Sequence, residues 1–177
     1  MNMIYTVPKG RIPGYVLEVL KRGRCPYLVP GSYYEDEGEI RICLDTSGLR
    51  ELSSLGMKKR QSGLGPAIHA ARSNRYALRD LTGLGDWLID PRSVSLKPQK
   101  VFWDEDLAVV RFCPAAPDED SGEGPAGLVR ALDRDSFGIS LGISEMILGH
   151  EQDGTVRWMD MARHIKKLGD IEDELCQ

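Results

Sequence analysis

The sequence lacks the long apolar runs and the basic excess that mark two large classes of protein. No stretch approaches the roughly 20 consecutive apolar residues of a membrane-spanning helix, and the N-terminus shows no basic and apolar leader. The formal net charge is −4, whereas nucleic-acid-binding proteins usually carry a basic excess. We therefore predict a cytoplasmic protein that is not integral to a membrane and does not bind nucleic acid.

Metal-ligating and redox-active side chains are also sparse. The three histidines, His69, His150 and His164, lie far apart and have no spacing typical of metal ligands. The cysteines are widely separated and form no C-x-x-C pair, which favours reduced thiols in a cytosolic protein. We therefore predict neither a metal site nor a cofactor site. The four cysteines are Cys25, Cys43, Cys113 and Cys176.

What the sequence does contain is typical of a globular chain with an α+β fold. Its 177 residues are 41% hydrophobic and 28% charged, which is enough to build a packed core. The order of the patterns predicts a small N-terminal lobe of sheet plus helix, followed by a mainly helical lobe with an inserted β-hairpin. The predicted parts are the N-terminal lobe at 1–48, a helical hairpin with the central β-hairpin unit at 49–113, a flexible acidic loop at 114–125 and C-terminal helices at 126–177, with 49–177 forming one lobe.

The N-terminal lobe shows clear local patterns. Residues 1–7 are predicted as a strand, and Pro13 opens an amphipathic helix that Gly23 ends. A hairpin follows, with an acidic loop at 35–38 and a return strand at 39–45. In that strand Ile40, Ile42 and Leu44 alternate with residues of the opposite face, which predicts one buried side.

The stretch 87–114 is predicted to organise the second lobe, after one helix starting near Leu49 and another starting at Pro66. It begins with a helix end and a turn at Asp90-Pro91. A strand over 93–97 is predicted next, with a second turn at 97–99. A hairpin over 101–112 follows, with its loop at 104–106.

Three helical patterns end the chain, over residues 126–132, 139–148 and 156–168. The last has an apolar stripe, which needs a partner surface. The final segment, 170–177, is predicted as an acidic tail.

The segment 96–102, Leu-Lys-Pro-Gln-Lys-Val-Phe, resembles the catalytic-loop region of protein kinases, whose pattern is H-R-D-L-K-P-E-N. In that alignment Ser95 stands at the catalytic aspartate and Lys100 at the metal-binding asparagine. Pro114 stands near the aspartate of the Asp-Phe-Gly motif, and no glycine-rich phosphate loop is found. Phosphoryl transfer depends on these side chains and their metal ions. The resemblance therefore implies a degenerate kinase-like fold, and we predict that the chain is not an enzyme.

A second resemblance covers most of the chain up to about residue 148. The sequence is similar to an uncharacterised bacterial domain family found N-terminal to forkhead-associated (FHA) domains. It is also similar, over fewer residues, to the pseudokinase-like cytosolic domain of a type VII secretion component. No FHA domain follows in this sequence, so we expect a stand-alone or truncated member and carry over no phosphothreonine recognition. The residues that support the match are Pro13-Gly14-Tyr15, Val19-Leu20, Gly38, Asp45-Thr46-Ser47-Gly48-Leu49, Trp87-Leu88-Ile89-Asp90-Pro91, Leu96-Lys97-Pro98, Val101-Phe102 and Phe112-Cys113-Pro114.

The most unusual charge pattern is a segment, residues 52–79, that contains basic but no acidic residues. A solvated face would explain it. The sharper hypothesis is a surface for an anionic partner such as an acidic peptide or phosphoprotein, with the chain's own acidic loop at 118–123 as another occupant. Trp103 and Trp158 are candidate interface anchors. The basic residues of this candidate surface are Lys58, Lys59, Arg60, Arg72, Arg75 and Arg79.

These patterns together predict a non-catalytic protein-interaction or scaffold domain, pseudokinase-like, in a bacterial cytosolic or membrane-proximal assembly. The predicted partner is a protein of unknown identity, and the oligomeric state stays open. Two alternatives remain at this point, an inactive nucleotide-binding domain and an enzyme of unrecognised type.

Overall fold

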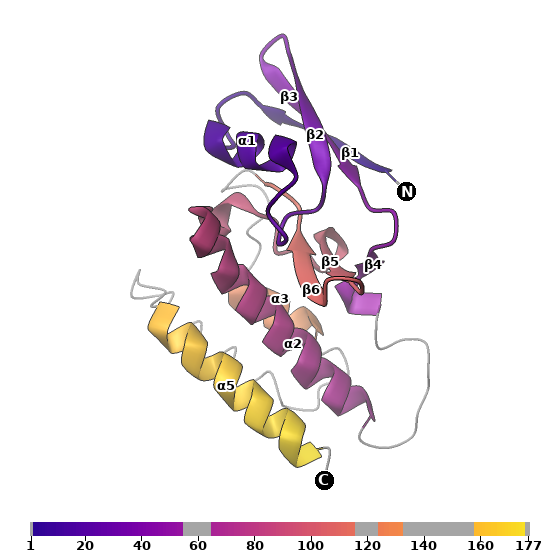
Figure 1. Ribbon diagram of the computed structural model, residues 1–177, viewed down its shortest axis with the longest axis vertical. Helices are drawn as coiled ribbons and strands as arrows, with labels where there is room; N and C mark the ends of the chain where they lie inside the picture. Colours follow the sequence, from indigo (N-terminus) through magenta and orange to yellow (C-terminus); the bar gives the residue numbers. More distant parts are fainter. Residues whose placement is uncertain (1, 55–64, 116–123, 133–157, 176–177) are drawn as a thin grey trace.

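The computed structural model describes residues 2–54, 65–115, 124–132 and 158–175 (Figure 1). These residues contain two three-stranded antiparallel sheets and four α-helices. The predicted α+β class is therefore confirmed. The finer boundaries of the predicted parts stay a prediction.

The first sheet consists of β1 (Asn2–Pro8), β2 (Gly31–Asp36) and β3 (Glu39–Asp45), in the order β1-β3-β2. Asp36 pairs with Glu39 across the hairpin, so only Glu37 and Gly38 form its turn. The predicted four-residue loop is too long, because residues 35 and 36 continue the strand. Gly38 has a φ of 85°, a left-handed conformation that glycine adopts at little cost.

One face of this sheet is buried as predicted. Ile40, Ile42 and Leu44 of β3 are each no more than 2% exposed. Helix α1 (Gly14–Arg22) packs beside the sheet with its apolar residues, which are Val16, Leu17 and Leu20. The helix ends at Gly23, whose φ of 60° and whose N–H bond to the carbonyl of Leu20 confirm the predicted C-cap.

The helix predicted from Leu49 is wrong over the described residues. Arg50–Glu51 instead forms β4, which pairs with Trp103 and Phe102 of β5 (Val101–Asp104), and Leu52–Ser54 is a short 3₁₀ turn. Helix propensity is a weak preference that a tertiary partner overrides, and here the partner is the open edge of β5. The remainder of that predicted helix lies outside the described residues.

The second sheet has the order β4-β5-β6, with β6 spanning Val109–Phe112. Asp104 pairs with Val109, so the hairpin loop covers residues 105–108 instead of the predicted 104–106. The segment 93–97 is not the predicted strand, since Val94 makes only an isolated bridge to Pro114. Both the polar and the apolar residues of 93–96 are buried, so this segment has no solvent face that an alternating pattern would reveal.

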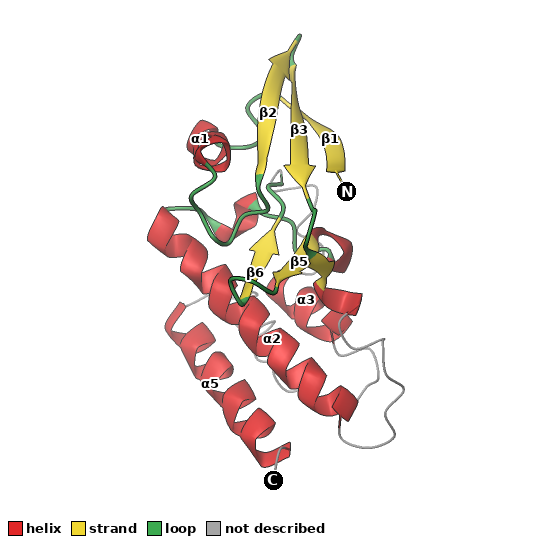
Figure 2. Cartoon of the chain, turned by 45° about the vertical axis from the view of Figure 1, so that its right-hand side comes forward, coloured by secondary structure: helices red, strands yellow, loops and turns green. Residues whose placement is uncertain are grey.

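Helix α2 (Gly65–Gly83) confirms the helix predicted from Pro66 and continues into a 3₁₀ segment, Leu84–Trp87. Helix α3 (Gly124–Leu132) confirms the first C-terminal pattern, and the pattern at 139–148 lies outside the described residues. Helix α5 (Trp158–Leu175) confirms the last pattern but extends through residues 170–175, which were predicted as a tail. Figures 1 and 2 show α5 lying antiparallel along α2 at the outer edge of the molecule.

The two sheets share one hydrophobic core, to which α1, α2, α3 and α5 all contribute. The first sheet is tied to the central unit by the hydroxyl of Tyr5, which donates to the carbonyl of Pro114. The sulfur atoms of Met3 and Cys113 lie 3.9 Å apart beside this contact. Among the described residues, no helix combines the length and apolarity that a membrane span requires.

The start of β2 allows a direct test of this packing. A Cβ atom added at Gly31 would overlap the carbonyl oxygen of Cys43 and lie 3.0 Å from the Cα of Leu44. Gly31→Ala should therefore lower the free energy of unfolding by about 1–3 kcal/mol, measured by urea denaturation. Gly14→Ala is the matched control, because a Cβ at that helical position meets nothing within 4 Å. Equal stability of the two variants would contradict the described close approach.

Candidate interaction surface on helix α2

Helix α2 places two of the predicted arginines, Arg72 and Arg79, on the side away from its buried face. Ala71, Leu78 and Leu81 are fully buried, whereas Arg72 and Arg79 are exposed. This is the division expected of an amphipathic helix that covers a core. The three arginines nevertheless have different surroundings, and each is described in turn.

Arg79 is bound within the molecule. Its Nε and Nη2 donate to the two carboxylate oxygens of Asp80 at 2.6 Å and 2.9 Å, and Nη2 also donates to the carbonyl of Ala108 at 3.1 Å. Asp80 is only 1% exposed and accepts a further hydrogen bond from the backbone N–H of Val110 at 2.7 Å. The hydrogen bonds to Asp80 raise the pKa of Arg79. Arg79 and Asp80 therefore join α2 to the β5–β6 hairpin.

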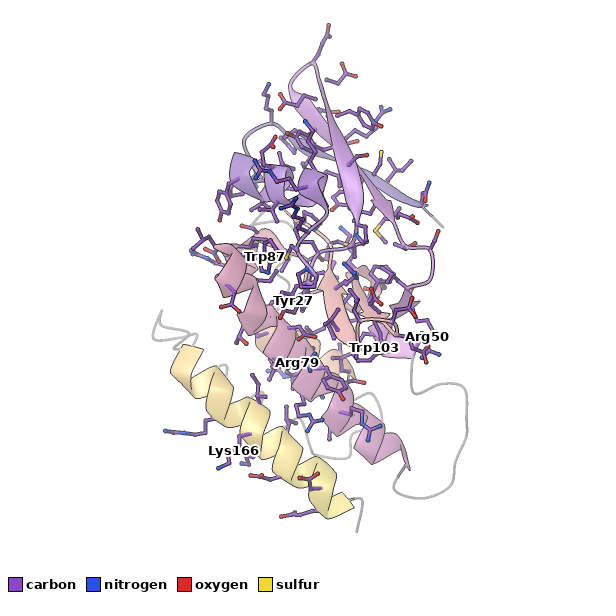
Figure 3. All side chains as sticks on the ribbon, in the orientation of Figure 1. Tyr27, Arg50, Arg79, Trp87, Trp103 and Lys166 are labelled. Atoms are coloured by element: carbon purple, nitrogen blue, oxygen red, sulfur yellow. The ribbon has the colours of Figure 1, made fainter. Side chains whose placement is uncertain are left out.

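Two aromatic rings extend this junction. Tyr76 of α2 stacks on Trp103 of β5, with ring centroids 5.1 Å apart and planes inclined by 24°. The guanidinium carbons of Arg75 and Arg79 lie 5.2 Å and 4.8 Å from the Tyr76 ring centroid, within the range of cation–π attraction. Figure 3 shows Arg79 and Trp103 on neighbouring elements. Trp103, which was predicted as an interface anchor, is thus half-buried within strand β5 and stacked on Tyr76.

The other predicted residues are distributed more widely. Arg75 faces α5, because its Nη1 lies 3.4 Å from the place of a Cβ on Gly169. Arg72 and Arg75 both take part in further interactions within the molecule. Lys58, Lys59 and Arg60 lie outside the described residues, as does the side chain of Trp158. The structure therefore brings Arg75 and Arg79 together over Tyr76, and the anionic-partner role of the set stays a prediction.

A second buried ion pair holds the other side of the hairpin. Asp104 accepts from Nε of Arg111 at 2.7 Å and, through its other oxygen, from the backbone N–H groups of residues 106 and 107. Nη1 of Arg111 donates to the carbonyl of Leu28 at 2.8 Å. Burial alone would raise the pKa of Asp104, but the hydrogen bonds from Arg111 and the backbone outweigh it, so this pKa is lowered. The sequence pattern assigned Asp104 to a loop and missed this role.

Asp80 and Tyr76 were also missed by the sequence analysis. One signal was available, since Asp80 is the first acidic residue after the basic segment 52–79 and follows Arg79 directly. Adjacent residues on a helix do not normally face each other. The bidentate contact forms because the edge of β6 offers the N–H of Val110 to the same carboxylate.

The positions that align with kinase catalytic residues are occupied by packing contacts. Ser95 is fully buried, its hydroxyl oxygen accepts from the N–H of Lys97, and its own N–H donates to the carbonyl of Cys113 at 2.8 Å. Nζ of Lys100 lies 4.9 Å from the ring centroid of Tyr5, whose hydroxyl binds the carbonyl of Pro114. Within the described part of the chain, no group of three or more histidine, cysteine, aspartate or glutamate side chains could hold a metal ion.

Solved structures with a likeness to this chain include the following two. The cytoplasmic fragment of Staphylococcus aureus EssB shares 15% identity with this chain, over 97% of this chain and 98% of the fragment, with a TM-score of 0.47. Rad53 residues 1–466, in complex with AMP-PNP, shares 16% identity over 75% of this chain but only 37% of its own chain, with a TM-score of 0.40. No family model and no curated protein matches the sequence. At these values neither likeness assigns a function, and the resemblance to the FHA-associated family stays a prediction.

The junction at Arg79 yields a stability test. Arg79→Met removes two hydrogen bonds to a buried carboxylate, so the free energy of unfolding should fall by about 2–3 kcal/mol. Arg72→Met, the same change on the exposed side of the same helix, should cost about 1 kcal/mol or less. Urea denaturation of the two variants measures the difference. If Arg72→Met proved as destabilising as Arg79→Met, the contact between Arg79 and Asp80 would not be what holds the hairpin against α2.

Proposed function

We propose that this chain is a non-catalytic protein-interaction or scaffold domain of degenerate kinase-like type, working in a bacterial cytosolic or membrane-proximal assembly. The observation that supports this proposal most directly is the packing around Ser95. A catalytic aspartate in a phosphotransferase must reach a substrate hydroxyl, and its neighbours must hold metal ions. Ser95 is fully buried and can do neither in this arrangement.

The contacts around Ser95 support the same proposal. Lys100 and Pro114, which align with the metal ligands of kinases, both contact Tyr5 of the first sheet. These contacts join the kinase-like segment and the residues that follow β6 to the first sheet. In the proposed fold this region therefore serves as a packing surface.

The proposed partner is a protein with an acidic segment that binds the exposed side of α2. From residue 52 to residue 79 the sequence contains no carboxylate. Asp80 is buried and its oxygens are engaged with Arg79 and Val110, so it repels an approaching anion weakly. The exposed Arg72 and the half-buried Arg75 would then exchange their contacts within the molecule for the carboxylates of the partner.

Thermal unfolding with and without ATP and Mg²⁺ tests the non-catalytic part of the proposal. A ligand present at a hundredfold excess over its dissociation constant adds about 2.7 kcal/mol of stability. We expect no change in Tm at millimolar ATP. A reproducible rise in Tm would contradict the packing argument and favour the alternative of an inactive nucleotide-binding domain.

Poly-L-glutamate is a suitable probe for the acidic-partner part. We expect fluorescently labelled poly-L-glutamate to bind the protein weakly, and more weakly as salt rises, because exposed charges are screened. Arg72→Glu combined with Arg75→Glu should abolish this binding, as measured by fluorescence anisotropy. Arg41→Glu combined with Arg11→Glu changes the net charge equally in the N-terminal lobe and should leave binding largely intact. Equal loss in both variants would show a general charge effect and exclude docking on α2.

A further inference from the structure

Helix α5 carries a row of exposed charged side chains among its described residues. Leu168 is fully buried and Ile165 is partly buried on the side that packs into the core with α2. Every exposed position that the structure describes on this helix is ionisable. These positions are Arg163, Lys166, Lys167, Asp170, Asp173 and Glu174.

The charges are separated by sign along the helix. Among the described positions, the basic residues precede Gly169 and the acidic residues follow it, while Asp160 stands in the first turn of the helix. Asp173 and Glu174 lie in the last turn, where the helix dipole favours basic residues. Like charges stand four residues apart in two places, Arg163 with Lys167 and Asp170 with Glu174, a spacing at which they repel. Within one copy of the chain these two pairs are unfavourable, whereas Lys166 and Asp170 are opposite charges at the same spacing.

The order becomes favourable when two copies are placed side by side. Arg163, Lys167, Asp170 and Glu174 are separated by four, three and four residues, so they form one stripe along α5. If a second α5 lies antiparallel on this stripe, Arg163 stands opposite Glu174 of the second copy and Lys167 stands opposite Asp170 of the second copy. A two-fold axis repeats both pairs.

We propose that this chain self-associates through the outer face of α5, as an antiparallel two-fold dimer held by charge complementarity. The occupant of the face is a second copy because the stripe is complementary to itself in the reversed direction. Within the described residues, no ion pair engages any of the four side chains of the stripe.

Helix α5 lies at the edge of the described structure. Figures 1 and 2 show it beside α2, on the side away from the two sheets. Figure 3 labels Lys166, one of its exposed charged residues. This proposal is independent of the proposed acidic partner of α2. It concerns the exposed side of α5, which faces away from α2.

The wild-type chain gives the first measurement. Sedimentation equilibrium at about 0.02 M salt should show a reversible monomer–dimer equilibrium, and about 0.5 M salt should shift it to monomer because the screening length falls to a few ångströms. A chain that stays monomeric at low salt up to millimolar concentration would overturn the proposal. So would a dimer that is indifferent to salt.

A charge exchange tests the pairing itself. The variant with Arg163→Glu and Lys167→Glu has an all-acidic stripe, and the variant with Asp170→Lys and Glu174→Lys has an all-basic one. Each alone should be monomeric, with self-association weakened by about tenfold or more. An equimolar mixture should form a heterodimer, because the two stripes are then complementary. Failure of the mixture to associate would overturn the proposed pairing.

Two controls separate docking from folding. All four substituted side chains are exposed, so both variants should keep a Tm close to that of the wild type, and loss of the dimer cannot then be attributed to unfolding. Lys166→Glu is the matched control for Lys167→Glu, since it makes the same change beside the stripe. If Lys166→Glu weakened self-association as much as Lys167→Glu, the stripe would not be the contact.

Discussion

The buried carboxylate of Asp80 is the interaction on which the second lobe depends. It lies on α2, accepts from Arg79 of the same helix and from the backbone of Val110 in β6, and thereby fixes the angle between helix and hairpin. A buried charge of this kind is stable only while its partners remain in place. The stack of Tyr76 on Trp103 and the contact of Arg79 with the loop carbonyl both follow from this geometry. Arg79, which the sequence suggested as a surface charge for a partner, therefore stabilises the fold through contacts within the molecule.

The contact between the two lobes also uses residues for which the sequence suggested another role. The segment that resembles a kinase catalytic loop is buried only at Leu96, Val101 and Phe102. Lys100 of this segment, together with Cys113 and Pro114, contacts Tyr5 and Met3 of the first sheet. Direct side-chain contacts of this kind hold two lobes in one orientation. The proposed scaffold role rests on this property, since the lobes of a phosphotransferase must admit a nucleotide and metal ions. Surfaces for partners are then left to the outer helices, α2 and α5, where charge is the main chemical feature.

Local patterns predicted the elements that have one buried and one exposed face. The alternation of Ile40, Ile42 and Leu44 predicted the buried side of β3, and Gly23 predicted the end of α1. Predictions failed where another part of the chain decided the outcome. Residues 50 and 51 form a strand because β5 offers them an edge to pair with. The strand predicted over residues 93–97 is absent, and residues 93–96 are buried on both faces. Of the candidate surface, the sequence found the arginines but not Asp80 or Tyr76, which give two of them their surroundings.

The sequence by itself determined the α+β class, the positions of α1, α2 and β3, and the absence of carboxylates along residues 52–79. These properties depend on neighbouring residues and on the periods of helix and strand, which are local. Only the tertiary structure decided that Arg79 is held by Asp80 and by the hairpin loop, whereas Arg72 lies on the exposed side of α2. That choice depends on contacts between residues such as Arg79 and Ala108, which are far apart in the chain, and on the burial of Asp80, which no local pattern encodes.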